Sequence, residues 1–292
     1  MLEELVYKLP TVDGGLHLCP LAALEPRSVW AFFKLYSVST DCRQIAEERA
    51  RFIQDFVKLF ELKLRVDGYG NMVIDVPGRG KGADLAPVII HTKILPEGAV
   101  TPLSPRHHWR GWTALVEARE IEGIQQEVVT AISSDQGAAA VVICTQLELA
   151  LGVDAGSHRP PLELMFSRSR RSEPLSSQYL DPNFLSGRHL ISLDSTAAGQ
   201  IGVGSSTDPT GPLVQSLANS MCRVNKRPAA LRQLDQAEDD QSFYATFPGM
   251  QIARLGVTLQ TLEEGRQCVT VSSVQSLSAV LKDVLTSFCR LD

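Results

Sequence analysis

Three residues of this sequence have side chains that could bind a metal ion and occupy comparable positions: His91, Asp135 and Asp194. Each follows a short apolar run of the kind that forms a buried strand. One neutral imidazole and two carboxylates are suitable ligands for zinc. Taken singly, each also has a structural interpretation: a hydrogen-bonded histidine at a strand end, a helix N-cap and a turn residue, respectively. Their joint occurrence in this order favours the metal site.

The elements that would position these residues alternate between strands and helices. Apolar runs and turn signals predict strands over residues 63–67, 71–76, 86–91, 162–166, 189–193, 199–204 and 250–257, and two more within 113–132. Helical spacing predicts helices over residues 25–36, 41–62, 137–151, 212–223, 239–247 and 274–289. The fold class that follows is α/β, a three-layer α/β/α sandwich with a mostly parallel central sheet.

In open α/β sheets, ligands bind beyond the carboxyl ends of the strands, where all three candidate residues fall. The continuous apolar run Val88-Ile89-Ile90 predicts a central, buried strand. We therefore expect His91 and Asp135 to face each other at the carboxyl edge of the sheet. Residues 1–24 are expected to form an irregular N-terminal segment, and residues 25–292 a single domain.

The composition excludes several classes of protein. The 292 residues are 44% apolar and 21% charged, which is typical of a globular chain. The net charge of -5 and the absence of a dominant basic patch argue against a nucleic-acid partner. No apolar run reaches the roughly 18 residues of a membrane span, so no membrane partner is expected. The N-terminus lacks the apolar core of a signal peptide, so a cytoplasmic location is expected.

Four segments in order resemble the di-zinc exopeptidases that include peptidase T, aminoacyl-histidine dipeptidase, aminoacylase and carboxypeptidase G. The first, Asp67-Gly68-Tyr69-Gly70-Asn71, is similar to the family's Asp-x-x-Gly-Asn turn. The second, His91-Thr92-Lys93-Ile94-Leu95-Pro96-Glu97-Gly98, is similar to His-x-Asp-x-Val-Pro-x-Gly. The third and fourth are Ser133-Ser134-Asp135-Gln136-Gly137 and Asp194-Ser195. The resemblance covers roughly residues 25–290 and implies a zinc-exopeptidase-like catalytic domain.

The sequence departs from this family at the residues that carry its chemistry. The aspartate that orients the ligand histidine is Lys93 here, and the acidic pair that supplies the general base and a metal ligand is Arg170-Arg171. The family's C-terminal histidine is missing, and the matching segment offers only Glu263.

These changes bear on the two metal positions that the resemblance implies. One metal position would use His91, Asp135 and Asp194. The second would share Asp135 and would need a ligand from the replaced acidic pair and the missing C-terminal histidine. Arg170 or Arg171 would bring a permanent positive charge to the second position, since a guanidinium does not deprotonate. Two like unit charges about 4 Å apart repel by about 4 kcal/mol at an effective dielectric of 20, and the repulsion doubles when one of them is a metal dication. We therefore expect no dinuclear centre, and no cofactor beyond at most one zinc ion.

The family also inserts a second, lid or dimerisation domain after the strand that follows Asp194. Here the strand predicted over residues 199–204 is followed closely by Pro209 and the helix from Pro212. The resemblance therefore implies that the lid domain is absent near residues 205–211.

The function expected from these features is that of a non-catalytic relative of the peptidases, which binds an unknown protein or a small peptide ligand or serves as a scaffold. The alternative is a metal-dependent peptidase or amidase with one ion at His91, Asp135 and Asp194. A third possibility is a purely structural subunit of an assembly.

The glycine-rich segment over residues 78–82 lacks the spacing of a phosphate-binding P-loop and is interpreted as a flexible turn.

Overall fold

The computed structural model describes most of the chain. The described residues are 8–10, 16–18, 20–36, 45–94, 114–121, 123–131, 140–151, 158–168, 179–196, 203–204, 211–226, 243, 245–261 and 267–289. Within them no helix is both long and apolar enough to cross a membrane.

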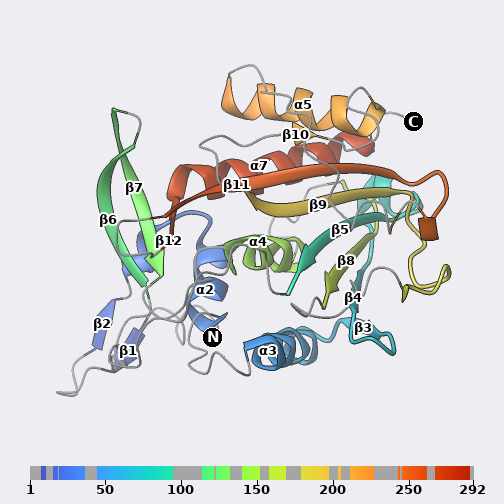
Figure 1. Ribbon diagram of the computed structural model, residues 1–292, viewed down its shortest axis with the longest axis horizontal. Helices are drawn as coiled ribbons and strands as arrows, with labels where there is room; N and C mark the ends of the chain where they lie inside the picture. Colours follow the sequence, from blue (N-terminus) through green and yellow to red (C-terminus); the bar gives the residue numbers. More distant parts are fainter. Residues whose placement is uncertain are drawn as a thin grey trace.

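One large sheet organises the described part of the chain (Figure 1). Its strands follow the order β3-β4-β8-β5-β9-β11-β12-β7-β6, and β10 pairs with β11 on the side. The strands are β3 (Lys63–Val66), β4 (Met72–Val76), β5 (Val88–Lys93), β6 (Ala114–Ile121), β7 (Ile124–Ala131), β8 (Leu162–Ser167), β9 (His189–Thr196), β10 (Val203–Gly204), β11 (Gln251–Thr261) and β12 (Gln267–Thr270).

The centre of this sheet is parallel. Strands β8, β5, β9 and β11 run in one direction as neighbours, whereas the strands on both flanks pair antiparallel. Strand β5 lies inside the parallel part, and Val88, Ile89 and Ile90 are each at most 1% exposed. The predicted central, buried strand is therefore confirmed, as expected for an apolar run covered on both faces.

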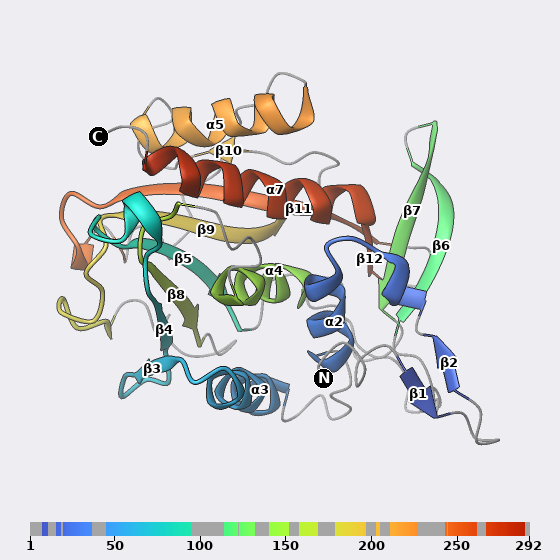
Figure 2. The ribbon, with the colours of Figure 1, turned by 180° about the vertical axis from the view of Figure 1, so that it is seen from behind.

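Five helices of eight or more residues lie in the described part: α2 (Arg27–Tyr36), α3 (Ile45–Leu59), α4 (Ala140–Leu151), α5 (Pro212–Asn225) and α7 (Val271–Phe288). Helix α4 is apolar on nearly all sides and is buried from Ala140 to Ala150. It packs between the sheet, α2 and α7, and α5 lies along α7 on the outside (Figures 1 and 2).

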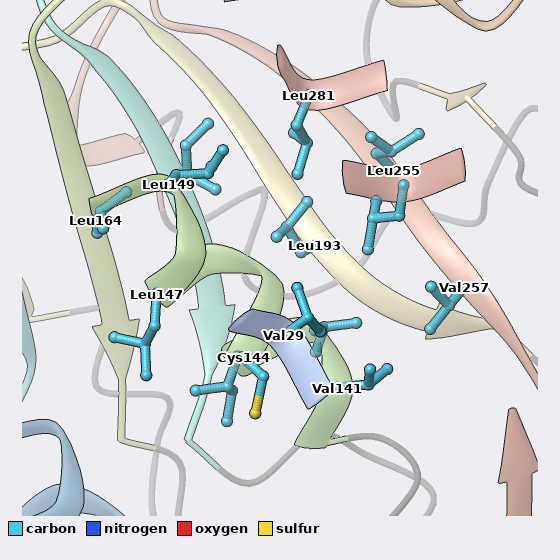
Figure 3. Close-up of a cluster of buried hydrophobic side chains, with 14 of the residues drawn as sticks. Val29, Val141, Cys144, Leu147, Leu149, Leu164, Leu193, Leu255, Val257 and Leu281 are labelled. Atoms are coloured by element: carbon cyan, nitrogen blue, oxygen red, sulfur yellow. The ribbon is translucent and has the colours of Figure 1, made fainter. Parts of the chain in front are cut away.

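The main hydrophobic core lies on this helical face of the sheet. Side chains of α2, α4 and α7 meet side chains of β8, β9 and β11, as the close-up of Val29, Cys144, Leu164, Leu193 and Leu281 shows (Figure 3). Burial raises the pKa of the Cys144 thiol, as expected for a cysteine that serves as a small apolar side chain.

A second cluster covers the opposite face of the sheet. It contains Ile89, Met165 and Leu190 from the central strands together with Leu185 and Phe243. Among the described residues this face is covered by residues 179–187 and by the helical residues 243, 245 and 246, rather than by a long helix. The predicted α/β fold with a mostly parallel central sheet is confirmed.

Several element boundaries differ from the predictions. Strand β12 was not predicted. It leads directly into α7 at Val271 with no turn residue between them, and its four residues are too few to show the alternation by which a strand is recognised. Helix α7 consequently begins three residues before the predicted start, with Thr270 as its N-cap, whose hydroxyl accepts a hydrogen bond from the Ser273 amide.

The N-terminal segment is also less irregular than expected. Strands β1 (Lys8–Pro10) and β2 (Leu16–Leu18) pair antiparallel, and a short 3-10 helix, η1 (Pro20–Ala23), follows them. Three residues are too few to show the alternation by which a strand is recognised. The helix predicted over residues 239–247 is described only at residues 243, 245 and 246, and the rest lies outside the described residues.

Candidate functional site

His91 lies near the carboxyl end of the central strand β5 and is 2% exposed. Its two ring nitrogens each have a hydroxyl partner from a neighbouring strand. The Nε2 atom lies 2.9 Å from the Ser167 hydroxyl of β8, and the Nδ1 atom lies 3.1 Å from the Ser192 hydroxyl of β9. The imidazole is thus bound across three adjacent parallel strands.

The two serine hydroxyls satisfy a neutral imidazole in either tautomer. A neutral ring has one nitrogen that donates and one that accepts, and a serine hydroxyl can do either. The ring of Phe243, which belongs to the second hydrophobic cluster, packs edge-on against the His91 ring, with their centroids 5.0 Å apart. His91 is therefore positioned as a buried, hydrogen-bonded side chain.

This arrangement does not fit a zinc ligand as it stands. A histidine binds zinc through the lone pair of one ring nitrogen, at about 2.0–2.1 Å. Either nitrogen of His91 would have to exchange its serine for the metal. Within the described ranges, no group of three or more histidine, cysteine, aspartate or glutamate side chains is placed to hold a metal ion.

Lys93 lies two residues beyond His91 on β5, opposite Ser167 of β8. Strand residues two apart share a face, so the half-buried Lys93 lies on the same face of the sheet as His91. The resemblance places the family's orienting aspartate at this position. The structure therefore brings a histidine, a lysine and two serines together at this edge.

The other predicted site residues are only partly covered by the structure. The backbone of Asp194 lies in β9 opposite Gly256 of β11, but its side chain is not described. Asp135, Arg170, Arg171 and Glu263 lie outside the described residues. The facing of His91 and Asp135, and the pairing of the arginines with carboxylates, stay predictions.

The turn over residues 67–71 is tied to the same edge of the sheet. The Asp67 carboxylate accepts hydrogen bonds from the Tyr69 amide at 2.9 Å and the Asn71 amide at 2.8 Å, and Gly70 has a φ of 83°. The Asn71 side chain then accepts a hydrogen bond from the Arg168 amide, 3.1 Å away, directly after β8. This motif thus fixes the end of β8, whatever its role in relatives.

Arg168 extends this link to a helix. Its guanidinium pairs with Glu47 of α3. Ser167 and Ser192 were not among the site residues predicted from the sequence. The available signal was a hydroxyl at the end of each buried strand, which is too common to mark a site.

Comparisons with known proteins agree with this architecture. No model of a known protein family matches the sequence, and no curated protein is similar to it. Solved structures do match. A tripeptidase from Staphylococcus aureus has a TM-score of 0.62 at 9% identity, covering 91% of this chain and 99% of that one. The aminopeptidase PepT from Bacillus cereus has a TM-score of 0.61 at 8% identity, covering 90% and 98%.

An archaeal aminopeptidase from Desulfurococcus kamchatkensis is also similar, with a TM-score of 0.56 at 11% identity and coverage of 87% of this chain and 93% of that one. These identities are low, so the likeness concerns the fold. The chain has the α/β fold of these peptidases.

Proposed function

We propose that this protein is a non-catalytic relative of the metallo-exopeptidases that acts by binding a protein or a small peptide ligand. The observation that carries the proposal is the hydrogen bonding of His91 and the lysine beside it. Both its ring nitrogens lie within hydrogen-bond distance of serine hydroxyls, and a lysine stands two residues further along the strand. A positive charge at that position disfavours a bound dication.

The sequence departures support the same proposal. Arg170 and Arg171 replace the acidic pair that the resemblance assigns to the general base and a metal ligand. Without a carboxylate base, no group is assigned to deprotonate an attacking water. In addition, only residues 205–211 separate β10 from α5, where the family inserts its lid domain. Loss of the lid would remove contacts that hold a substrate.

The alternative is a hydrolase with one metal ion at His91, Asp135 and Asp194. It is favoured by the position of His91 in β5 and of Asp194 in the adjacent β9, both within the parallel centre of the sheet. In that case His91 would bind the ion after releasing one serine.

A hydrolysis assay separates the two functions. The protein is incubated with a panel of dipeptides and tripeptides in the presence of zinc, manganese or cobalt. We expect no hydrolysis above that of buffer, and no difference between the wild type and His91→Asn. Co-purification from cells would then identify the bound partner.

The matched control is His189→Asn. His189 is a second histidine of the central sheet; it is half-buried and lies at the amino end of β9, with its ring centroid 5.2 Å from that of Phe288. Metal-dependent hydrolysis that His91→Asn abolishes and His189→Asn retains would overturn the proposal and establish the alternative.

A further inference from the structure

The two edges of the large sheet are formed by unlike strands. Strand β3 ends one side with four residues and begins with Lys63, whose side chain is 73% exposed. Strand β6 ends the other side with eight residues and contains neither proline nor lysine. Proteins usually protect an edge strand by shortness, lysine, proline or a bulge, because an open edge pairs readily with another chain. Strand β6 is therefore the less protected edge.

Strand β6 is accessible along its outer side. It forms a hairpin with β7 at one end of the molecule, and both views show β6 on the side of this hairpin that faces away from the rest of the sheet (Figures 1 and 2). In the part of the chain that the structure describes, no strand pairs with that side of β6. Ala118 and Glu120, in the second half of the strand, are exposed. A strand from another chain therefore has access to this edge.

The hairpin geometry determines which backbone groups of β6 point outward. Two residues connect the paired residues Ile121 and Ile124. In a hairpin with a loop of this length, the pair next to the loop exchanges its backbone hydrogen bonds, and such pairs alternate along antiparallel strands. The N–H and C=O groups of Glu117 and Arg119 therefore point toward β7, whereas those of Ala118 point to the open side.

The charged side chains of β6 are complementary to those of a second β6. Glu117 and Arg119 lie on one face of the strand, because residues two apart share a face, and they form an ion pair of 2.8 Å. When two β6 strands run antiparallel with Ala118 opposite its own counterpart, Glu117 of each copy lies opposite Arg119 of the other. Opposite charges in such cross-strand positions are stabilising. The ion pair within each strand would thus extend into a network of four charges.

The neighbouring symmetric registers are disfavoured. Because only every second residue of β6 has outward groups, the register can shift only by steps that keep these groups opposite each other. One such step places Glu117 opposite Glu117 of the second copy, and the step in the other direction places Arg119 opposite Arg119. Like charges directly opposite each other are destabilising. The charges of β6 therefore favour the register centred on Ala118.

We propose that two copies of this protein pair antiparallel through β6, around a two-fold axis at Ala118, so that their large sheets join into one. A two-fold arrangement is the commonest in homo-oligomers and uses the same surface of both copies. The interface is independent of the function proposed for the His91 edge, because β9, β11, β12 and β7 lie between β5 and β6 in the sheet. A single pair of strands is a small interface, so we expect a dimer that dissociates on dilution.

Sedimentation velocity of the full chain tests this inference. The wild type is measured from micromolar to near-millimolar concentrations and is expected to shift from monomer to dimer. Ala118→Pro removes an outward N–H group and no hydrogen bond to β7, and proline is tolerated at such a position of an edge strand. We expect this variant to remain monomeric at every concentration.

Charge reversal tests the register. Arg119→Glu converts two opposite-charge pairs into like-charge pairs, so we expect the dissociation constant of the dimer to rise roughly tenfold. The double variant Glu117→Arg with Arg119→Glu restores the complementarity and should dimerise as the wild type does. The control is Lys58→Glu, which reverses a charge of α3 whose side chain is 77% exposed, and it should also dimerise as the wild type does.

Two results would overturn the inference. One is a wild type that remains monomeric over the whole range of concentrations. The other is a dimer that folded Ala118→Pro and Arg119→Glu form as readily as the wild type, since that dimer would use another surface. If Ala118→Pro does not fold, the charge variants decide: weaker dimerisation of Arg119→Glu and its recovery in the double variant are expected, and equal dissociation constants refute the interface.

Discussion

At the scale of single residues, His91 shows how a predicted position can be right while its environment is not predictable. The apolar run before it placed it at a strand end, and it lies there. Its partners Ser167 and Ser192 are 76 and 101 residues away in the sequence. Only the strand order β8-β5-β9 makes them neighbours, and the sequence pattern does not specify that order.

The close packing of Gly82 leads to a prediction about a single residue. The glycine-rich segment, expected to be a flexible turn, instead contains the short 3-10 helix η2 (Gly80–Gly82), which packs on residues 158–161. In Gly82→Ala the new Cβ would meet the backbone of Arg159, which cannot move aside without breaking its pairing with Arg79. We expect a loss of about 1–3 kcal/mol in the free energy of unfolding, measured by urea denaturation.

The control for this change is Gly68→Ala, because a Cβ on Gly68 has no atom within 4 Å. This variant should be neutral or more stable by up to about 1 kcal/mol, since alanine reduces the entropy of the unfolded chain. If both variants unfold at the same urea concentration, the close contact between the glycine-rich segment and residues 158–161 is wrong.

At the scale of elements, the buried strands and helices were the features best predicted by the sequence. β5 begins with an uninterrupted apolar run, β8 and β9 are mostly apolar in their first five residues, and α4 is apolar over most of its length. The sequence could not predict how α4 is held in the core. Its Glu148 is 1% exposed and accepts hydrogen bonds from Ser28 of α2 at 3.0 Å and Ser278 of α7 at 2.7 Å.

Lys282 of α7 completes this connection, with its ammonium 3.0 Å from the Glu148 carboxylate. Lys282→Met would leave a buried carboxylate without its counter-charge. Because the Lys282 side chain is 36% exposed and two serines still donate to the carboxylate, we expect a loss of about 1–3 kcal/mol, measured by chemical denaturation.

The matched control is an exposed ion pair between α5 and α7. Arg223 of α5 pairs with Asp283 of α7, but its side chain is 51% exposed. Exposed pairs contribute about 1 kcal/mol or less, so Arg223→Met should be close to wild type in stability. Equal losses in the two variants would show that the Glu148 pair does not connect α4 to α7 as described.

At the scale of the whole molecule, we propose that the fold has been kept while the metal chemistry has been lost. The chain keeps the peptidase architecture at identities of 8–11%, with TM-scores of 0.56–0.62. An apolar core can be preserved under extensive substitution as long as volume and pattern are kept. A metal site cannot, because it needs particular ligands at particular positions. The candidate site was therefore harder to predict than the fold that carries it.

The zinc content of the purified protein tests this separation most directly. The protein is saturated with zinc, dialysed against zinc-free buffer and measured by elemental analysis, alongside His91→Asn and His189→Asn. We predict far less than one zinc per chain in all three proteins, because both ring nitrogens of His91 lie within hydrogen-bond distance of Ser167 and Ser192 and Lys93 lies on the same face of the strand. One or two zinc ions per chain, retained by the wild type and by His189→Asn but lost in His91→Asn, would contradict it.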